Sequence, residues 1–206
     1  MNRLLAALLA ASSLSAMRRI QCSLKDGETV TWYWSGYAYS RVPGEADRQL
    51  FAVEGMNIRR CGPLNGATDG SFKMVTREIL LYRDPKTGAV LDTWANPWTG
   101  KQVKVVHVAN DPVNQRIGAT DRAGRPFALP LVANGGDWWL TSTVPLFYRN
   151  PLGGDYQDYI GGKYHATEMF NFFGDVADLA DPRRASAGVS VGWVRQSDWL
   201  PWMEMG

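Results

Sequence analysis

The fold of this chain is decided by strand-like stretches, of which the clearest is FKMVTREILLYR, residues Phe72–Arg83. Side chains of a strand alternate between two faces, and both faces here are rich in β-branched, aromatic or large apolar residues. The stretch runs directly into DPKTG at residues 84–88, where the proline presets a turn and the glycine accepts a positive φ. We therefore predict a strand over residues 72–83 that ends in a tight turn.

The same alternation recurs along most of the chain. Four further stretches are predicted to be strands, at residues 30–40, 50–60, 103–108 and 189–196. Turn-forming sequences lie at residues 96–100, 121–125 and 134–137. Little of the chain has helical periodicity, so we expect helix only within residues 4–20 and near residues 174–180. Short strands broken by regular turns predict a mainly β fold, an antiparallel barrel of calycin-like or up-and-down type with few short helices.

Composition limits the partners that the protein can have. The 206 residues are enough for one domain with a real core, and 45% hydrophobic with 20% charged residues is typical of a folded globular chain. The net charge of +2 is small and the arginine pairs are scattered, so we expect no nucleic-acid partner. The apolar run at residues 4–11 is too short to cross a bilayer, so we expect no membrane span. Composition does not indicate the oligomeric state.

Residues 1–16 admit two interpretations. They contain one arginine, a short apolar run and a tail of small residues, the three parts of a secretory signal peptide. They could equally form an alanine- and leucine-rich helix that packs on the domain. Cys22 and Cys61 bear on the choice, because they could pair in an exported protein and would be two buried thiols in the cytosol. The protein is then periplasmic or secreted if residues 1–16 are a signal peptide, and cytoplasmic otherwise.

Residues 17–206 are expected to form a single barrel-like domain. Its last stretch, residues 199–206, is apolar and aromatic and has no polar tail. Because chain ends usually lie in solvent and carry polar residues, we expect the domain to continue past residue 206.

Nine tryptophans are distributed unevenly among these elements. Trp32 and Trp34 lie in the predicted strand at residues 30–40, and Trp193 lies in the one at residues 189–196. Aromatic side chains combine a large apolar surface with a polar edge, so they can line a pocket for a flat ligand. We predict that Trp32, Trp34, Trp193 and Tyr82 form the wall of a ligand-binding cavity.

Four charged or titratable side chains stand on faces that are otherwise apolar. Glu78 is the only charge on its face of the predicted strand, and Glu54, His107 and Arg195 each follow apolar neighbours at period two. If these faces line a barrel, we expect His107 to act as general base, Glu78 or Glu54 as acid, and Arg195 to hold a substrate oxyanion. The alternative is a buried Arg–Glu ion pair that fixes strand register, with His107 hydrogen-bonded in the core.

Asn110 and Asp111 follow where a strand runs into an Asn-Asp-Pro turn. We predict that both bind ligand, the alternative being that they cap the turn. His107 with Asp111, and His165 with Glu168, contain the ligand types of a two-histidine, one-carboxylate iron site. The chain has only two histidines, and His165 and Glu168 would lie on opposite faces of a strand. We therefore expect no metal and no other cofactor.

Several blocks of the sequence carry a family resemblance. In chain order they are WYWSG at residues 32–36, YRDPKTGAVLDTWANPWTGK at 82–101, VHVANDPVN at 106–114, EMFNFFG at 168–174 and WLPWMEMG at 199–206. With these blocks the chain, from about residue 17 to its end, resembles the bacterial family known as domain of unknown function 1838. The resemblance implies no activity or catalytic residue. It implies that relatives continue past the last block, that some carry export signals, and that the stretch before Cys22 belongs to the domain.

These patterns together predict that the protein binds a small, largely apolar or aromatic molecule in an aromatic-lined barrel cavity. If the charged residues act on that molecule, the chemistry is acid/base, of lyase, isomerase or hydrolase type. Two other classes fit the same sequence: a non-catalytic carrier of lipocalin type, and a carbohydrate-binding module whose aromatic side chains stack on sugars from an exposed face.

Overall fold

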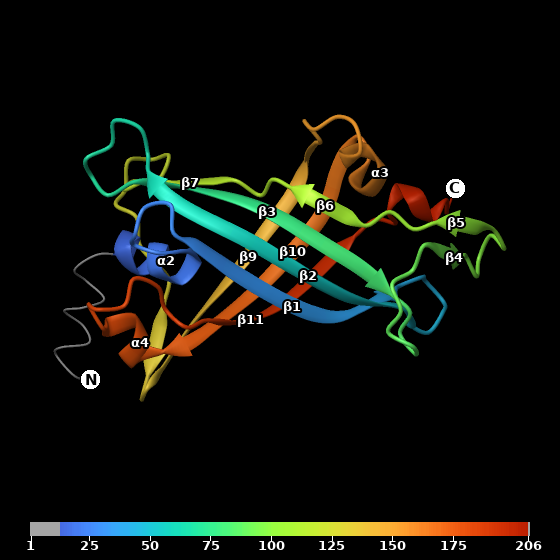
Figure 1. Ribbon diagram of the computed structural model, residues 1–206, viewed down its shortest axis with the longest axis horizontal. Helices are drawn as coiled ribbons and strands as arrows, with labels where there is room; N and C mark the ends of the chain where they lie inside the picture. The colour runs from blue at the N-terminus through green and yellow to red at the C-terminus, as the bar shows by residue number, and fades with distance from the viewer. Residues whose placement is uncertain (1–12, 206) are drawn as a thin grey trace.

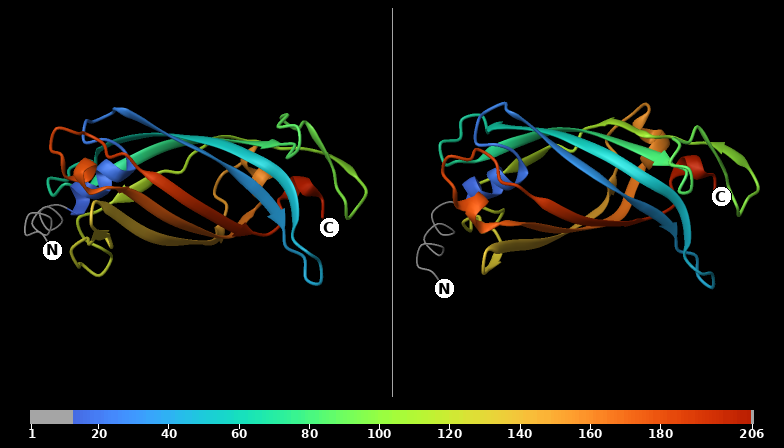
Figure 2. Two further views of the ribbon diagram at one scale, coloured as in Figure 1. Left: turned by 90° about the horizontal axis from the view of Figure 1, so that it is seen from below. Right: turned by 60° about the horizontal axis from the view of Figure 1, so that its bottom comes forward.

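Two antiparallel sheets that face each other form most of the molecule. The computed structural model describes residues 13–205, and Figures 1 and 2 show the two sheets as separate layers. The first sheet has the strand order β1-β2-β3-β6, with β7 also paired to β3, and the second has the order β11-β10-β9-β8. A small hairpin of β4 and β5 extends from one end (Figure 1). The prediction of a mainly β, antiparallel fold is confirmed.

The elements have the following bounds. The first sheet contains β1 (Thr29–Ser40), β2 (Arg48–Pro63), β3 (Phe72–Arg83), β6 (Val108–Asp111) and β7 (Gln115–Ile117). The second contains β8 (Val132–Asn134), β9 (Asp137–Arg149), β10 (Lys163–Asp175) and β11 (Ser190–Ser197), and the hairpin is β4 (Thr93–Ala95) with β5 (Gln102–Lys104). The helices are α2 (Ser13–Gln21), α3 (Tyr156–Ile160), α4 (Val176–Ala180) and the 3-10 turn η1 (Pro201–Met203).

Four of the five predicted strands are confirmed close to their predicted bounds, as β1, β2, β3 and β11. The predicted strand at residues 103–108 is wrong in part, because the structure divides it between β5 and β6. The long strands β9 and β10 have no counterpart in the prediction. A proline, Pro145, interrupts the pattern of β9, and it is tolerated because β8 pairs only with residues 137–139, so that β9 has a free edge there.

The predicted barrel is not confirmed. Strand pairing among the described residues ends at β1 and β6 in the first sheet and at β11 and β8 in the second. No described ladder joins one sheet to the other, so side-chain packing holds the two layers together.

The N-terminal helix belongs to the domain where the structure describes it. The predicted helix is confirmed over residues 13–20, while residues 1–12 lie outside the described part of the chain. A disulfide joins Cys22, just after α2, to Cys61 in β2. Ala16 packs beside the buried core. Within residues 13–205 no helix has the length and apolar character needed to cross a membrane.

Buried side chains gather at the two ends of the facing sheets. One end holds Leu50, Phe51, Leu80, Tyr82, Val103, Val105, Tyr159, Trp202 and Met203. The end beside α2 holds Ile20, Trp138, Leu140, Phe172 and Leu179, and a neighbouring cluster of Cys22, Cys61, Phe72, Met74 and Ile117. Inward-facing side chains between the ends, among them Trp32, Trp34, Glu78, Phe170 and Trp193, are only half-buried. Solvent therefore reaches the middle of the layer between the sheets.

Candidate functional site

Three carboxyl groups and a guanidinium come together in this half-buried middle. Glu78 of β3 and Asp111 of β6 are direct cross-strand partners in the first sheet. Glu168 of β10 and Arg195 of β11 are partners in the second. Arg195 Nη1 lies 3.0 Å from Glu168 Oε1, with side chains 25% and 18% exposed respectively. We call these four residues the interior cluster.

Within each sheet, the strand register places two members of the interior cluster side by side. The row through the first sheet runs Trp32–Asn57–Glu78–Asp111. The charge of Glu168, on the second sheet, adds to the rise in the pKa of Glu78 and the charge of Arg195 opposes it, so the two pairs lie close enough to interact. The cluster therefore draws on both sheets and depends on how they pack.

A chain of hydrogen bonds holds Glu78 from one side. Asn57, which is buried, donates from Nδ2 to Glu78 Oε2 at 3.1 Å. Arg59 donates from Nε to Asn57 Oδ1 at 2.8 Å and from Nη1 to the side chain of Gln21 at the end of α2. Because the Asn57 oxygen is taken by Arg59, its amide nitrogen must point to Glu78. The guanidinium of Arg59 also lies 4.2 Å from the centre of the Trp32 ring.

Burial changes the proton affinity of the interior cluster. It raises the pKa of Glu78, Asp111 and Glu168, because removing a carboxylate from water disfavours its charge. At Glu78 the hydrogen bond from Asn57 and the charge of Arg195 oppose the rise in pKa, while the neighbouring carboxylates add to it. Burial lowers the pKa of Arg59 to about 10. The carboxyls thus hold protons at higher pH than exposed ones, as general acids and bases require.

Aromatic rings line the side of the interior where β1 approaches β11. Trp34 and Trp193 have ring centres 5.3 Å apart, and Trp32 meets Phe172 edge-on at 5.9 Å. Trp34 lies flat over Gly55, where a Cβ would come within 2.0 Å of its ring. The prediction that Trp32, Trp34 and Trp193 face the interior agrees with these positions.

Three tyrosines outside the predicted site lie near the same carboxyls. Tyr148 and Tyr164 stack with ring centres 4.8 Å apart. Burial raises the pKa of Tyr164 to about 12, and the charge of Asp111 adds to the rise. Burial and then Asp111 likewise raise the pKa of Tyr159 in α3. All three phenols therefore stay neutral donors. Tyr148 and Tyr164 lie on the unpredicted strands, which explains why they were missed.

His107 and Tyr82 occupy the sheet edge and the core instead of the cluster. The backbone N–H of Tyr82 donates to His107 Nδ1 at 3.1 Å, and the two rings stack 6.0 Å apart. The pairing of β6 with β3 reaches only Leu80. The His107 side chain therefore accepts the hydrogen bond from Tyr82 that a backbone carbonyl would accept if the pairing continued. The Nδ1 lone pair of His107 is occupied by this hydrogen bond. The arrangement fits a histidine that is hydrogen-bonded in a structural role better than the predicted general base. Tyr82 is buried against Phe51 and Trp202.

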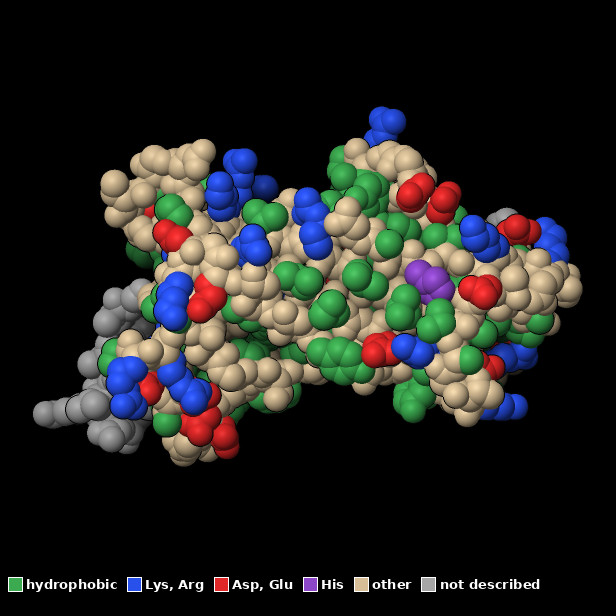
Figure 3. Space-filling model, in the orientation of Figure 1, with side chains coloured by type: hydrophobic (Ala, Val, Ile, Leu, Met, Phe, Trp, Pro, Cys, Tyr) green, Lys and Arg blue, Asp and Glu red, His purple; other side chains and the backbone are tan. Residues whose placement is uncertain are grey.

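Glu54 faces away from the interior, so the predicted convergence is wrong for this residue. Its Oε2 lies 2.6 Å from Arg83 Nε, and its Oε1 accepts a hydrogen bond from the Tyr33 hydroxyl at 3.1 Å. The register of β1 with β2 shifts at Ala38, which places an additional residue, Leu50, in β2. Counting alternation from Leu50 therefore assigns the wrong face. Figure 3 shows this outer face, where exposed hydrophobic side chains gather.

Asn110 and Asp111, the last two residues of β6, do not enter the interior together. Asn110 has a left-handed backbone (φ 58°), its side chain is exposed, and its carbonyl accepts a hydrogen bond from the Tyr156 hydroxyl at 3.3 Å. Asp111 joins the interior cluster. Of the residues predicted as acid/base or polar ligand groups, the structure therefore brings together Glu78, Arg195 and Asp111, and adds Glu168.

The histidine and carboxylate pairs do not assemble a metal site. Glu168 faces inward, whereas His165 is exposed on the outer face and lies 2.5 Å from Asp198. No group of three potential metal-ligating side chains occurs within residues 13–205.

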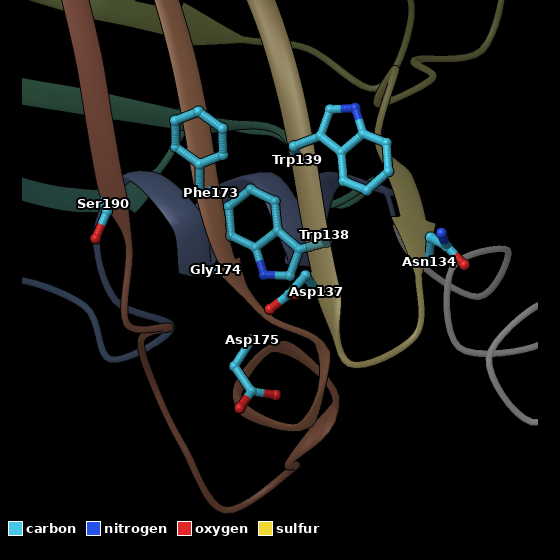
Figure 4. A pocket seen from close by; sticks show the side chains of 8 residues that line it. All are labelled: Asn134, Asp137, Trp138, Trp139, Phe173, Gly174, Asp175 and Ser190. Atoms are coloured by element: carbon cyan, nitrogen blue, oxygen red, sulfur yellow. The ribbon is translucent and has the colours of Figure 1, made fainter.

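An open pocket of about 560 Å³ lies elsewhere, at the ends of β8, β9, β10 and β11 (Figure 4). Its lining is Asn134, Asp137, Trp138, Trp139, Phe173, Gly174, Asp175 and Ser190. Figure 4 shows the Trp138 indole beside Gly174, where a Cβ would meet the ring at 2.6 Å. Asp175 uses its side chain to cap α4 by accepting from the Ala177 N–H. These contacts have structural roles, and the pocket is distinct from the interior cluster.

The tryptophans do not form a flat sugar-binding platform. All nine lie within the described residues, and each is buried or half-buried. Neighbouring pairs are steeply inclined, with ring planes 55° apart for Trp34 and Trp193 and 60° apart for Trp98 and Trp199. Stacking on a sugar from an exposed face would need accessible, roughly coplanar rings.

Comparison with known proteins identifies a family. No curated protein and no solved structure matches the chain. A family model described as "Protein of unknown function (DUF1838)" matches residues 27–206, which contain both sheets and every member of the interior cluster. The chain therefore belongs to the family of domain of unknown function 1838.

Proposed function

We propose that the space between the sheets binds a small, largely apolar or aromatic molecule, and that Glu78 and Asp111 exchange protons with it. The observation that carries the proposal is the convergence of three carboxyls and Arg195 between half-buried aromatic rings. Groups with perturbed pKa values that share one accessible interior are characteristic of functional sites.

A purely structural cluster would need fewer acids. One ion pair fixes strand register, and Glu168 with Arg195 supplies it. Glu78 and Asp111 remain, opposite each other on neighbouring strands, where two like charges destabilise a sheet. Protonation of one member relieves the repulsion and leaves a proton donor beside a proton acceptor. That arrangement favours acid/base chemistry over simple structural pairing.

Each part of the site has a role in this proposal. Trp32, Trp34 and Trp193 contact the ring of the ligand, and Arg195 holds a polar group on it. Two facing sheets can enclose such a molecule as the interior of a calycin-like barrel would. The proposal therefore does not depend on closure of the barrel.

Binding is tested by blocking the interior with a matched control. Ser142 and Thr143 are neighbours on β9, but Ser142 is half-buried on the inward face and Thr143 is exposed. Indane, a small bicyclic hydrocarbon, should shift amide NMR signals of the interior strands in the wild type and in Thr143→Trp. Ser142→Trp should abolish these shifts. Absence of binding to the wild type, or equal binding by both variants, would contradict the proposed site.

The acid/base part is tested with 1-indanone, whose C2 hydrogens exchange with solvent when a base removes them. Wild-type protein should accelerate deuterium incorporation from D₂O, and Glu78→Gln and Asp111→Asn should each reduce the acceleration. Glu54→Gln serves as the control, because Glu54 lies on the outer face. Binding of 1-indanone without accelerated exchange would instead favour the carrier of lipocalin type.

A further inference from the structure

Tyr159 carries a hydroxyl whose hydrogen-bonding capacity is unused. Its side chain is only 3% exposed, and its hydroxyl oxygen has no hydrogen-bond partner among the described residues. The ring packs in the cluster that contains Phe51, Tyr82 and Trp202. Buried polar groups are nearly always paired, so an exception requires an explanation.

The position of Tyr159 supplies that explanation. Figure 1 places α3 beside β6, and the Tyr156 hydroxyl joins the two elements through the Asn110 carbonyl. Asp111 is close enough that its charge, after burial, raises the pKa of Tyr159. Because α3 packs on β6 at Asn110, the residue before Asp111, Tyr159 lies on the side of the interior cluster formed by Asp111.

We infer, on the basis of the proposed function, that Tyr159 donates a hydrogen bond to a carbonyl oxygen of the ligand, so that the site takes small ring-bearing ketones or aldehydes.

The chemistry of the surrounding groups favours an oxygen acceptor over an amine. A neutral phenol and a guanidinium are hydrogen-bond donors, and burial raises the pKa of the neighbouring carboxyls, which favours their protonated, donating form. A cationic amine would need ionised carboxylates, which burial disfavours, and it would be repelled by Arg195. A carbonyl has no N–H or O–H of its own and accepts two hydrogen bonds, so it is complementary to this set of donors.

Removing the unpaired hydroxyl should have opposite effects on thermal stability and on ligand binding. In Tyr159→Phe the ring remains in its cluster and only the unsatisfied hydroxyl is lost. The free protein should therefore melt at or above the wild-type temperature. The same variant should bind 1-indanone about tenfold more weakly, as expected for one lost hydrogen bond, while its affinity for indane stays unchanged or increases.

Tyr156→Phe is the matched control. It lies on the same helix, but its hydroxyl already donates to the Asn110 carbonyl at 3.3 Å. We expect this variant to lose some thermal stability and to keep the wild-type affinity for both probes. The two tyrosines should thus behave in opposite ways in both measurements.

A spectroscopic readout separates a hydrogen bond from a change in packing. The carbonyl ¹³C resonance of labelled 1-indanone should move downfield on binding to wild type, and this movement should be lost in Tyr159→Phe and kept in Tyr156→Phe. If Tyr159→Phe leaves both the affinity for 1-indanone and the carbonyl shift unchanged while indane still binds, the inference is wrong and the proposed site stands. If indane fails to bind wild type, the proposed site itself is wrong and the inference is overturned with it.

Discussion

Replacing Gly55 by alanine is expected to displace the indole of Trp34 and weaken the packing of β1 against the second sheet. A Cβ at position 55 would lie 2.0 Å from Cζ2 of Trp34 and 2.3 Å from its Cε2. Overpacking of this kind costs about 1–3 kcal/mol. Loss of the ring contact between Trp34 and Trp193 adds about 0.5–1.5 kcal/mol. Gly55→Ala should therefore lower the free energy of unfolding by about 2–4 kcal/mol.

Urea unfolding followed by tryptophan fluorescence measures this loss. Gly192→Ala on β11 is the control, because a Cβ there meets nothing within 4 Å, and its effect should stay within about 0.5 kcal/mol. Adding Gly55→Ala to Trp34→Ala should cost little more than Trp34→Ala alone, since the clash has been removed. Equal stability of Gly55→Ala and Gly192→Ala, or full additivity with Trp34→Ala, would refute the proposed close approach.

Three further outcomes are expected. Replacing Cys22 and Cys61 together by serine should reduce the free energy of unfolding by about 4 kcal/mol, the chain-entropy value for a loop of about 40 residues. If reductant does not change the urea midpoint of the wild type, this expectation is wrong. Burial raises the pKa of Glu78, so this residue binds more protons in the native state than in the unfolded state. Its contribution to the free energy of unfolding is therefore fully present at acid pH and is lost as the pH rises through the native pKa. Glu78→Gln should therefore flatten the dependence of stability on pH in that range and stabilise the protein at neutral pH; a variant with the wild-type pH profile would contradict the assignment. Glu54→Gln, which breaks a partly exposed ion pair with Arg83, should cost about 1 kcal/mol or less and leave indane binding unchanged in the NMR titration.

Regular alternation in the sequence identifies the three long strands of the first sheet and part of the candidate site. In β3 the alternation is unbroken, so the inward position of Glu78 follows directly from it. In β2 the additional residue at Leu50 shifts the alternation, and Glu54 is assigned to the wrong face. A bulge depends on how two strands pair, which the pattern of one strand does not contain.

The second sheet was harder to predict, and half of the interior cluster lies on it. Glu168 stands at period two with Phe170 and Phe172, a signal that could have identified β10. The outward positions of β9 carry Thr141, Thr143 and Pro145, which resemble a loop. Tyr159 lies in a five-residue helix whose place near Asp111 depends on tertiary packing alone. No local pattern specifies such a contact.

The half-buried centre between the sheets has a calorimetric consequence. Trp32, Trp34, Phe170 and Trp193 keep apolar surface in contact with water after the chain has folded. The heat-capacity change of unfolding should consequently fall at or below the usual ~12–15 cal/mol/K per residue. A ring-bearing ligand would remove that water, so its binding should have a negative heat-capacity change although the fold does not alter. If the proposed ligand binds there, it completes hydrophobic burial that folding alone leaves incomplete.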